Sequence, residues 1–292
     1  MIRNATTLVS NALKKFEENS NKNGIKGVPT GFKDLDSITS GLQEGNLIII
    51  ASRPGMGGSL LATSIVKNAA INNGQAVAFF SLENSSHYYI TKMIASETGM
   101  SLDMLRDGRL EPHEWELLNL KLDGLSKSQI YMEDALLSFS DLKIKATELV
   151  ENKNVKLIVF DSLQSIWMSD SPTKSHEEKI VETTKYLKIL AKELQVPIIA
   201  LSQIAEEAEE KEGSSMRPLL SDLEESESEA MVQMADVILF VYRPEYYGVS
   251  EWEDGSSSEG QAELILAKHK NGGLDNMRVR FRGYLAEFSD LP

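Results

Sequence analysis

A glycine-rich loop at residues 51–59 carries the first residues that could do chemistry. Its sequence, ASRPGMGGS, follows an aliphatic run and precedes a segment with helical periodicity. A strand that leads through such a turn into a helix directs several backbone N–H groups toward one point, where the helix dipole adds positive potential. Phosphate is the ligand that suits this arrangement. We therefore expect residues 51–59 to form a phosphate-binding loop.

This loop departs from the usual phosphate-binding pattern at one position. In GxxxxGK[ST] the lysine contacts the β- and γ-phosphates and the hydroxyl holds magnesium. Gly55, Gly57 and Ser59 suit that pattern, but Gly58 stands where the lysine belongs. An ordinary glycine-rich turn between a strand and a helix explains the loop equally well. The loop by itself leaves both interpretations open.

Polar residues end three further apolar runs. Glu83 ends FFSLE, Asp161 ends KLIVFD and Gln203 ends PIIALSQ. Ligands of open α/β sheets gather at the carboxyl ends of parallel strands, and a carboxylate at Asp161 is suited to hold magnesium through water. One polar strand end has a simpler explanation, because water begins there. A hydroxyl, Glu, Asp and Gln in this order favour a nucleotide site.

Short apolar runs alternate with helix-length segments over most of the chain. The runs are too short for helices and predict buried strands at 46–52, 76–83, 129–133, 156–162, 197–203 and 235–242. The segments between them predict helices at 59–73, 86–98, 111–125, 140–152 and 175–194. This alternation is typical of an α/β fold with a mostly parallel twisted sheet flanked by helices. Residues 261–270 and 277–283, separated by NGGLDN, predict antiparallel C-terminal edge strands.

The composition excludes several classes of protein. With no cysteine among 292 residues there is no disulfide, thiolate metal site or cysteine nucleophile, and the 4 histidines lack metal-binding spacing. No apolar run approaches the roughly 20 residues that span a bilayer, and the N-terminus lacks a signal-peptide core. We expect a cytoplasmic protein without a membrane partner. Lys+Arg 30 against Asp+Glu 44 gives a net charge of −14, which repels nucleic acid unless basic residues cluster.

The N-terminal segment predicts an amphipathic helix ahead of the main domain. Residues 5–19 place Leu8, Val9, Leu13 and Phe16 on one face, and a polar stretch follows. We divide the chain into a linker helix and linker at 1–24 and one domain at 25–292. The apolar stripe of the helix must be buried on its own domain or on a neighbour, and the periodicity leaves both open. The acidic stretches 205–216 and 248–260 are predicted to be mobile, because they have few apolar residues.

A set of ordered motifs makes the prediction more specific. The run GVPTGFKDLDSITSGLQEGNLIIIASRPGMG is followed by FFSLENS, LRDGRLEPHEW, LIVFDSLQSI, VPIIALSQI, RPLLSDLEES, ADVILFVYRPEYY and KHKNGG. Over about residues 25–290 the chain resembles the ring-forming ATPase domain of bacterial replicative DNA helicases of the DnaB type, which has a RecA-like P-loop NTPase fold. The segment 5–19 falls where those helicases carry a linker helix that docks on the adjacent subunit. The resemblance therefore implies a homo-oligomeric ring, a hexamer in this family.

The resemblance also implies roles for individual residues. ATP phosphates would be cradled by the loop residues Arg53, Pro54, Gly55, Met56, Gly57, Gly58 and Ser59. Magnesium would lie at Ser59 and Asp161, Glu83 would orient the attacking water, and Gln203 would sense the γ-phosphate. The lysine and arginine that project into the neighbour's site in the family correspond to Lys268 and Lys270. Independently of the resemblance, three tyrosines near the end of one predicted strand could hold an adenine or simply pack: Tyr242, Tyr246 and Tyr247.

Departures from the family pattern cluster at functional positions and remove positive charge. Gly58 replaces the loop lysine, Lys270 replaces the arginine that acts in trans, and Glu224 stands where arginine is usual. The loop after Gln203 is acidic, so tight binding of single-stranded DNA is not expected from this chain alone. Loss of an arginine that acts in trans can reduce phosphoryl transfer about 10³–10⁵-fold. Neither Arg53 nor Lys67, two helical turns on, is expected to replace the missing lysine.

Two functions from different classes remain. The first is an ATP-dependent helicase that unwinds duplex DNA as a ring on single-stranded DNA, with hydrolysis impaired by the missing lysine. The second is a catalytically inactive paralogue that acts as a nucleotide-binding assembly or regulatory subunit beside an active helicase or other replication proteins. A RecA-like recombination or signalling ATPase is a third option, which the helicase-specific motifs outside the loop oppose.

Overall fold

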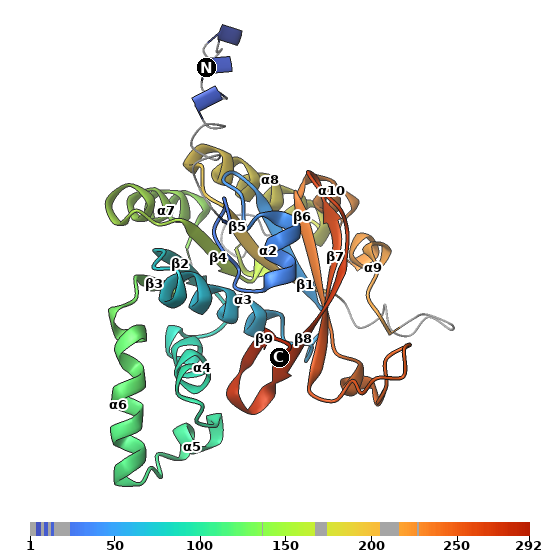
Figure 1. Ribbon diagram of the computed structural model, residues 1–292. Coiled ribbons are helices and arrows are strands. Elements are labelled where there is room, and N and C mark those ends of the chain that lie inside the picture. Colours follow the sequence, from blue (N-terminus) through green and yellow to red (C-terminus); the bar gives the residue numbers. More distant parts are fainter. Residues whose placement is uncertain are drawn as a thin grey trace.

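A mixed nine-stranded sheet forms the centre of the molecule (Figure 1). The computed structural model describes residues 4–6, 9–10, 13–14, 24–135, 137–166, 174–204, 216–226 and 228–292, with the side chains of 224–226 left out. The strand order is β3-β2-β4-β5-β1-β6-β7-β8-β9. The strands are β1 (Leu47–Ser52), β2 (Val77–Ser81), β3 (Ile130–Glu133), β4 (Leu157–Asp161), β5 (Ile198–Gln203), β6 (Val237–Tyr242), β7 (Gln261–His269), β8 (Asn276–Arg282) and β9 (Glu287–Asp290).

The first six strands are parallel and the last three are antiparallel. β1 lies between β5 and β6, with Ile48 beside Ile199 on one side and Val237 on the other. β7 pairs antiparallel with β6, and β8 and β9 extend that edge. Every residue of β1, β2 and β4 is buried, as expected for parallel strands covered on both faces. The predicted α/β sheet with antiparallel C-terminal edge strands is confirmed.

Helices cover both faces of the sheet and form two hydrophobic cores. On one face α2 (Lys33–Thr39), α3 (Gly58–Lys67) and α4 (Ser86–Thr98) pack on side chains such as Ile50 and Phe79. On the other face α7 (Phe139–Lys153), α8 (His176–Leu194) and α10 (Glu229–Met234) pack on side chains such as Ile49 and Phe160. Because side chains alternate along a strand, neighbouring residues of β1 feed the two cores.

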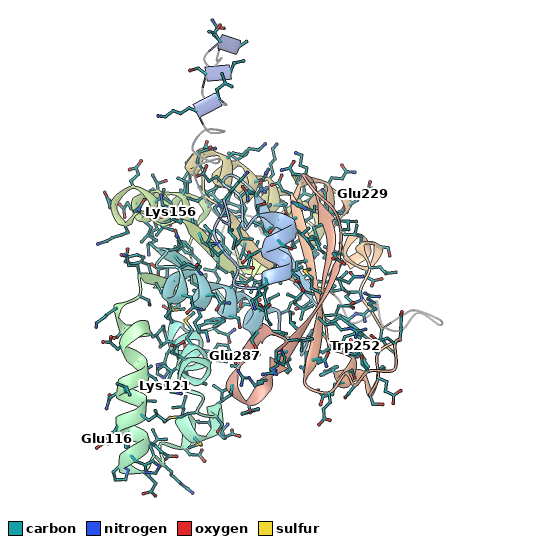
Figure 2. The ribbon with its side chains drawn as sticks, in the orientation of Figure 1. Glu116, Lys121, Lys156, Glu229, Trp252 and Glu287 are labelled. Atoms are coloured by element: carbon teal, nitrogen blue, oxygen red, sulfur yellow. The ribbon has the colours of Figure 1, made fainter. Side chains whose placement is uncertain are left out.

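The remaining helical segments lie at the periphery. α6 (Pro112–Lys127) packs on α4, and Lys121, labelled in Figure 2, donates from Nζ to the Thr98 carbonyl over 2.8 Å. A π-helical turn, η1 (Asn68–Asn72), continues α3, so the predicted helix 59–73 is present as two joined parts. The other segments are α5 (Leu102–Asp107), α9 (Leu220–Ser226) and the 3₁₀ turns η2 (Leu163–Ser165), η4 (Pro244–Tyr247) and η5 (Gly283–Leu285).

Two acidic segments, 205–216 and 248–260, were predicted to be mobile. Residues 205–215 lie outside the described residues. Residues 248–260, predicted to be mobile, instead form a hydrogen-bonded turn. Trp252, labelled in Figure 2, holds the Arg278 guanidinium 4.6 Å from its ring centroid and donates from its indole nitrogen to Gln261 over 3.0 Å. One aromatic ring thus orders a segment that is otherwise acidic and small. In the N-terminal helix, the described residues Val9 and Leu13 are 58% and 56% exposed.

Candidate phosphate-binding site

The glycine-rich loop connects β1 to α3 as the sequence predicts. Gly55 and Gly57 have φ of +77° and +95°, a backbone conformation that favours glycine. α3 begins at Gly58, and its N-cap residue Gly57 makes no side-chain capping hydrogen bond. The first N–H groups of a helix have no partner within the helix, so at α3 they are open to a ligand. Backbone and helix dipole together make this a site for an anion.

The Ser52 hydroxyl lies where the Cβ of a side chain at position 58 would be. A Cβ atom built on Gly58 would lie 2.4 Å from the Ser52 Oγ. In GxxxxGK[ST] the first glycine stands five residues before the second, which is the position of Ser52. The chain therefore carries a side chain where the pattern has glycine, and glycine where it has lysine. Ser52 was not among the predicted site residues, although the spacing of the pattern could have pointed to it.

The two cations weighed as substitutes for the lysine point elsewhere. Arg53 is 3% exposed, and its guanidinium donates to the Met216 carbonyl over 2.6 Å and pairs with Asp222 at 3.5 Å. Lys67 donates from Nζ to the Ser96 hydroxyl over 2.6 Å and to Glu287 over 3.3 Å; Glu287 is labelled in Figure 2. Both side chains have partners away from the loop, as expected from their positions in the sequence.

Two residues that follow β6, Arg243 and Tyr246, contact the glycine-rich loop. Arg243 donates from Nη1 to the Gly55 carbonyl over 2.8 Å, and its guanidinium stacks 3.8 Å from the Phe281 ring centroid. A Cβ on Gly55 would lie 2.9 Å from the ring of Tyr246, so that ring lies directly against the loop. Tyr242 and Tyr247 stack on each other with ring centroids 6.1 Å apart. Of the three tyrosines, Tyr246 is the one placed to meet a ligand, and an adenine contact stays a prediction.

Asp161 lies at the end of β4 and is nearly buried, at 3% exposure. It accepts a hydrogen bond on Oδ2 from the Tyr89 hydroxyl. Burial raises the pKa of Asp161, while hydrogen bonds from Tyr89 and Ser59 act in the opposite direction. The loop hydroxyl and the strand-end carboxylate therefore meet, as the sequence predicts for a magnesium pair.

Two residues of α4 that the sequence analysis missed complete the surroundings of Asp161. Tyr89 is fully buried, and its pKa is raised, first by burial and then by the negative charge of Asp161. Lys92, one turn farther along, is 9% exposed with its Nζ 3.6 Å from the ring centroid of Tyr88. Its positive charge lowers the pKa of Asp161. No motif points to these residues, because only the packing of α4 on α3 brings them to the site.

Glu83 and Gln203 lie at the same edge of the sheet. Glu83 accepts hydrogen bonds from the Ser162 hydroxyl and, over 3.3 Å, from the Ser165 hydroxyl, both just beyond β4. Gln203 is exposed and lies beside Ser52 in the pairing of β5 with β1. The structure thus brings the loop, Asp161, Glu83 and Gln203 to one edge. The roles that the resemblance implies for them stay predictions.

Lys268 and Lys270 lie near the amino ends of the parallel strands, away from the carboxyl ends that carry the candidate site. Lys268 donates from Nζ to the carbonyls of Val232 and Gln233 at the end of α10, over 2.7 and 2.9 Å. Lys270 pairs with Asp236 at 3.9 Å, next to the start of β1. The loop follows the other end of β1, about 15–20 Å away along the strand. Neither lysine can reach the phosphate loop of its own chain.

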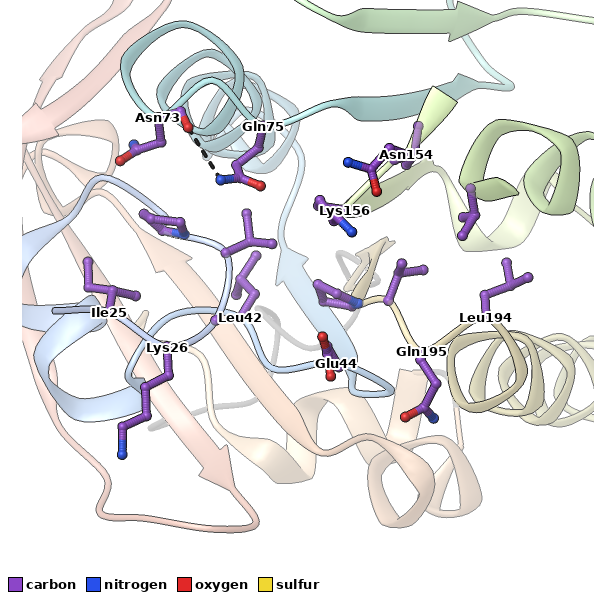
Figure 3. Close-up of a pocket in the computed structure, with 17 residues that line it drawn as sticks. Ile25, Lys26, Leu42, Glu44, Asn73, Gln75, Asn154, Lys156, Leu194 and Gln195 are labelled. Carbon is purple, nitrogen blue, oxygen red and sulfur yellow. Dashed lines mark hydrogen bonds between the residues drawn. The ribbon is translucent and has the colours of Figure 1, made fainter. Parts of the chain in front are cut away.

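A hollow of about 620 Å³ also lies near the amino ends of the parallel strands (Figure 3). It is bordered by Gln75, Lys156 and Gln195, which precede or begin strands whose other ends form the candidate site. The hollow is therefore separate from the phosphate loop. Within the described ranges no group of three or more His, Asp or Glu side chains could hold a metal by itself, and no helix there is long and apolar enough to cross a membrane.

Comparison with known proteins agrees with this geometry. Residues 27–290 match the family described as DnaB-like helicase C terminal domain. The chain is 34% identical over 291 residues to the replicative DNA helicase DnaB of Geobacillus stearothermophilus, covering 99% of this chain and 62% of that protein. It is 34% identical over 278 residues to the replicative DNA helicase DnaC of Bacillus subtilis (strain 168), covering 94% and 59%.

Two solved structures share the fold. One, described as an ATPase domain, superimposes with a TM-score of 0.86 and 29% identity over 99% of this chain and 100% of that chain. A DnaB-like replicative helicase, described with its interactions with primase, gives a TM-score of 0.83 and 28% identity over 100% of this chain and 68% of that chain. The chain spans about three fifths of the length of the curated relatives. With its matched family, its nine-stranded sheet and its strand-end site, this chain belongs to the DnaB-like helicase C-terminal domain family.

Proposed function

We propose that this chain is a nucleotide-binding domain of a DnaB-like replicative helicase, with ATP hydrolysis impaired by the missing loop lysine. One observation supports nucleotide binding. The N-terminus of α3 has no side-chain cap, it follows two glycines of positive φ, and Ser59 hydrogen-bonds to Asp161 beside it. The backbone N–H groups fit a triphosphate such as ATP. Residues 25–292 form the binding domain, and residues 1–24 serve as its linker. The cytoplasm, where DnaB-type replication takes place, is its proposed location.

Impaired hydrolysis follows from the supply of cations around the loop. The transition state of phosphoryl transfer is stabilised chiefly by positive charge. Gly58 offers none, and Arg53 and Lys67 are bound to partners elsewhere. Lys92 is a nearby cation, but its ammonium lies beside Asp161 and over the Tyr88 ring, not at the lysine position of the loop. Backbone amides can hold a ground-state nucleotide without those side chains. We therefore expect binding to persist and the rate of hydrolysis to be low.

A ring of several copies is the proposed assembly. Lys268 and Lys270 lie far from the loop of their own chain, and we propose that they act on the site of another chain. Val9 and Leu13 expose the apolar stripe of the N-terminal helix, which suits docking on a neighbour. We propose a hexamer built through that helix. Single-stranded DNA in its channel would face the acidic loop after Gln203, which weakens the contact.

A specific observation also favours the second function, a catalytically inactive nucleotide-binding subunit beside an active helicase or other replication proteins. The Ser52 hydroxyl lies where the Cβ of a lysine at position 58 would be. The loop therefore has no room for that side chain unless Ser52 moves. An assembly or regulatory subunit would use nucleotide as a structural ligand.

Two glycine variants test nucleotide binding. Gly57→Ala places a Cβ at φ +95°, 3.1 Å from the Phe288 ring, and should disrupt the loop. Gly108→Ala is the matched control, because Gly108 also has positive φ, at +65°, with open space around it. Calorimetric titration with ADP and ATP should show binding by the unmodified chain and by G108A, and at least about a tenfold loss in G57A. Equal affinity in G57A and G108A would place nucleotide elsewhere.

A further inference from the structure

The Tyr89 hydroxyl contacts Asp161, the carboxylate that the resemblance assigns to magnesium binding. It donates to Asp161 Oδ2 and accepts a hydrogen bond from Asn84 Nδ2 over 3.3 Å. A phenol bonded to a carboxylate makes a strong, charge-assisted hydrogen bond. Both polar functions of Tyr89 are therefore satisfied by the protein. The hydroxyl has a donor and an acceptor before any ligand arrives.

The Tyr89 ring cannot easily move away. It is fully buried, and it packs on Phe79 with centroids 4.7 Å apart and on Tyr88 at 5.1 Å, edge to face. A rotation that freed Asp161 would drive the ring into this core, which is closely packed. Tyr89 therefore holds its position on Asp161 by packing as well as by hydrogen bonding.

Asp161 has few directions left for a metal-bound water. Asp161 is 3% exposed, with the Tyr89 hydroxyl on Oδ2 and a further hydrogen bond from the Ser59 hydroxyl of the loop. Magnesium keeps several of its waters and demands near-octahedral geometry. A water of that shell must reach a free lone pair of the carboxylate in the correct direction. In this chain the hydroxyls of Tyr89 and Ser59 already occupy two of the about four acceptor sites of the carboxylate.

Positive charge near Asp161 is also supplied by the chain. Lys92 extends from the next turn of α4, and its ammonium acts on Asp161 while resting 3.6 Å from the Tyr88 ring centroid. A fixed ammonium beside a carboxylate reduces its attraction for a divalent cation. Tyr89 and Lys92, both from one face of α4, thus oppose magnesium at Asp161 in two ways.

We propose that the Tyr89 hydroxyl takes the place of a magnesium-bound water on Asp161, so that this chain binds nucleotide without needing magnesium. The site fits the phosphates of ATP but does not fit its metal well. This inference rests on the proposed nucleotide site and specifies the form of the ligand, the metal-free nucleotide. Tyr89 is a positioning residue here, because it acts through Asp161.

The test compares the magnesium dependence of ADP binding in three proteins. The unmodified chain, Tyr89→Phe and Tyr186→Phe are titrated by calorimetry in magnesium and in EDTA. Tyr186→Phe is the matched control: Tyr186 also donates a partly buried hydroxyl, to the Phe139 carbonyl, on the other face of the sheet. We expect the two affinities of the unmodified chain and of Y186F to agree within about twofold. In Y89F magnesium should strengthen ADP binding at least about tenfold.

The unmodified chain alone can overturn the proposal, whether or not Y89F folds. A tenfold or greater gain of affinity from magnesium in that chain would contradict it, as would a Y89F protein with unchanged magnesium dependence. Absence of ADP binding in every variant would instead refute the proposed function. Tyr89 is then tested without nucleotide, by electron paramagnetic resonance of Mn²⁺. Uptake of Mn²⁺ by Y89F but not by the unmodified chain or by Y89F/D161N supports the blocking role, and equal uptake by all three refutes it.

Discussion

Restoring the lysine at position 58 should destabilise the protein unless Ser52 is changed as well. Gly58→Lys would place its Cβ 2.4 Å from the Ser52 Oγ, whereas even favourable carbon–oxygen contacts in proteins are about 3.3–3.6 Å. Ser52 is 8% exposed, so its hydroxyl would have to shift within a buried site to make room. Overpacking of this kind costs about 1–3 kcal/mol. Gly58 is the first residue of α3, so replacing this glycine returns at most the roughly 0.8–1 kcal/mol of a helix interior, which leaves a net loss of stability.

The double variant Ser52→Gly, Gly58→Lys removes the conflict. Glycine in a strand costs about 0.5–1 kcal/mol, which the gain in α3 offsets, so its stability should be close to that of the unmodified chain. Ser52→Ala should relieve the conflict only in part, because the Ser52 Cβ would remain 3.3 Å from the new Cβ. The interaction free energy between the two positions should be about 1–3 kcal/mol and favourable to the double variant.

Chemical denaturation of the single and double variants measures that interaction, and ADP titration measures binding. Gly58→Ala is the control for charge: it should be destabilised like G58K but gain no affinity. S52G/G58K should bind ADP more tightly than either single variant, while hydrolysis stays low because Lys270 and the acidic loop are unchanged. Additive free energies of unfolding, within about 0.5 kcal/mol, would refute the claim that Ser52 occupies the lysine position.

Three further outcomes follow from the described contacts. Lys92→Met should weaken ADP binding about fivefold, because about 1 kcal/mol of attraction to phosphate is lost near the site; titration checks it, and unchanged affinity would place Lys92 outside the site. Arg53→Met should lower the free energy of unfolding by about 3 kcal/mol, the low end for a broken buried pair, because its partner Asp222 is only partly buried; denaturation checks it, and a loss below about 1 kcal/mol would contradict it. Hydrogen bonds from Ser256 and Arg278 lower the pKa of Asp254 to about 2. Since this folded-state pKa is depressed, its contribution is present above the ordinary value of 3.8 and is lost as pH falls toward 2; NMR titration of Asp254 should show this, and a pKa near 3.8 would contradict it.

The fold was predictable because its buried strands appear in the sequence as short, continuous apolar runs. Runs such as 46–52 and 156–162 are apolar without alternation, which only strands covered on both faces require. β9 was not predicted, since Glu287–Asp290 is short and owes its place to pairing with β8. The turn at 248–260 was misjudged for a similar reason: the contact of Trp252 with Arg278 joins residues far apart in the chain.

The candidate site was predictable where residues end strands and unpredictable where they reach the site through packing. Asp161 and Gln203 follow from the rule that ligands gather at the carboxyl ends of parallel strands. Tyr89 lies within a helix, where an aromatic residue ordinarily indicates a core position, and it is indeed buried. Only the packing of α4 on α3 shows that its hydroxyl meets Asp161. Ser52 shows this limit only in part: the spacing of the pattern marks its position, but its conflict with position 58 is a distance in space.

The rate of phosphate release at saturating ATP tests the central claim most directly. The nucleotide should occupy the loop, which calorimetry establishes first, and hydrolysis should then be far below the roughly 1–10³ s⁻¹ of typical enzymes, with or without single-stranded DNA. The assay uses the intact chain at concentrations that permit assembly, with G57A as the blank. Occupancy with release no faster than the G57A blank is the predicted result. Release at or above about 1 s⁻¹ that G57A abolishes would contradict the account.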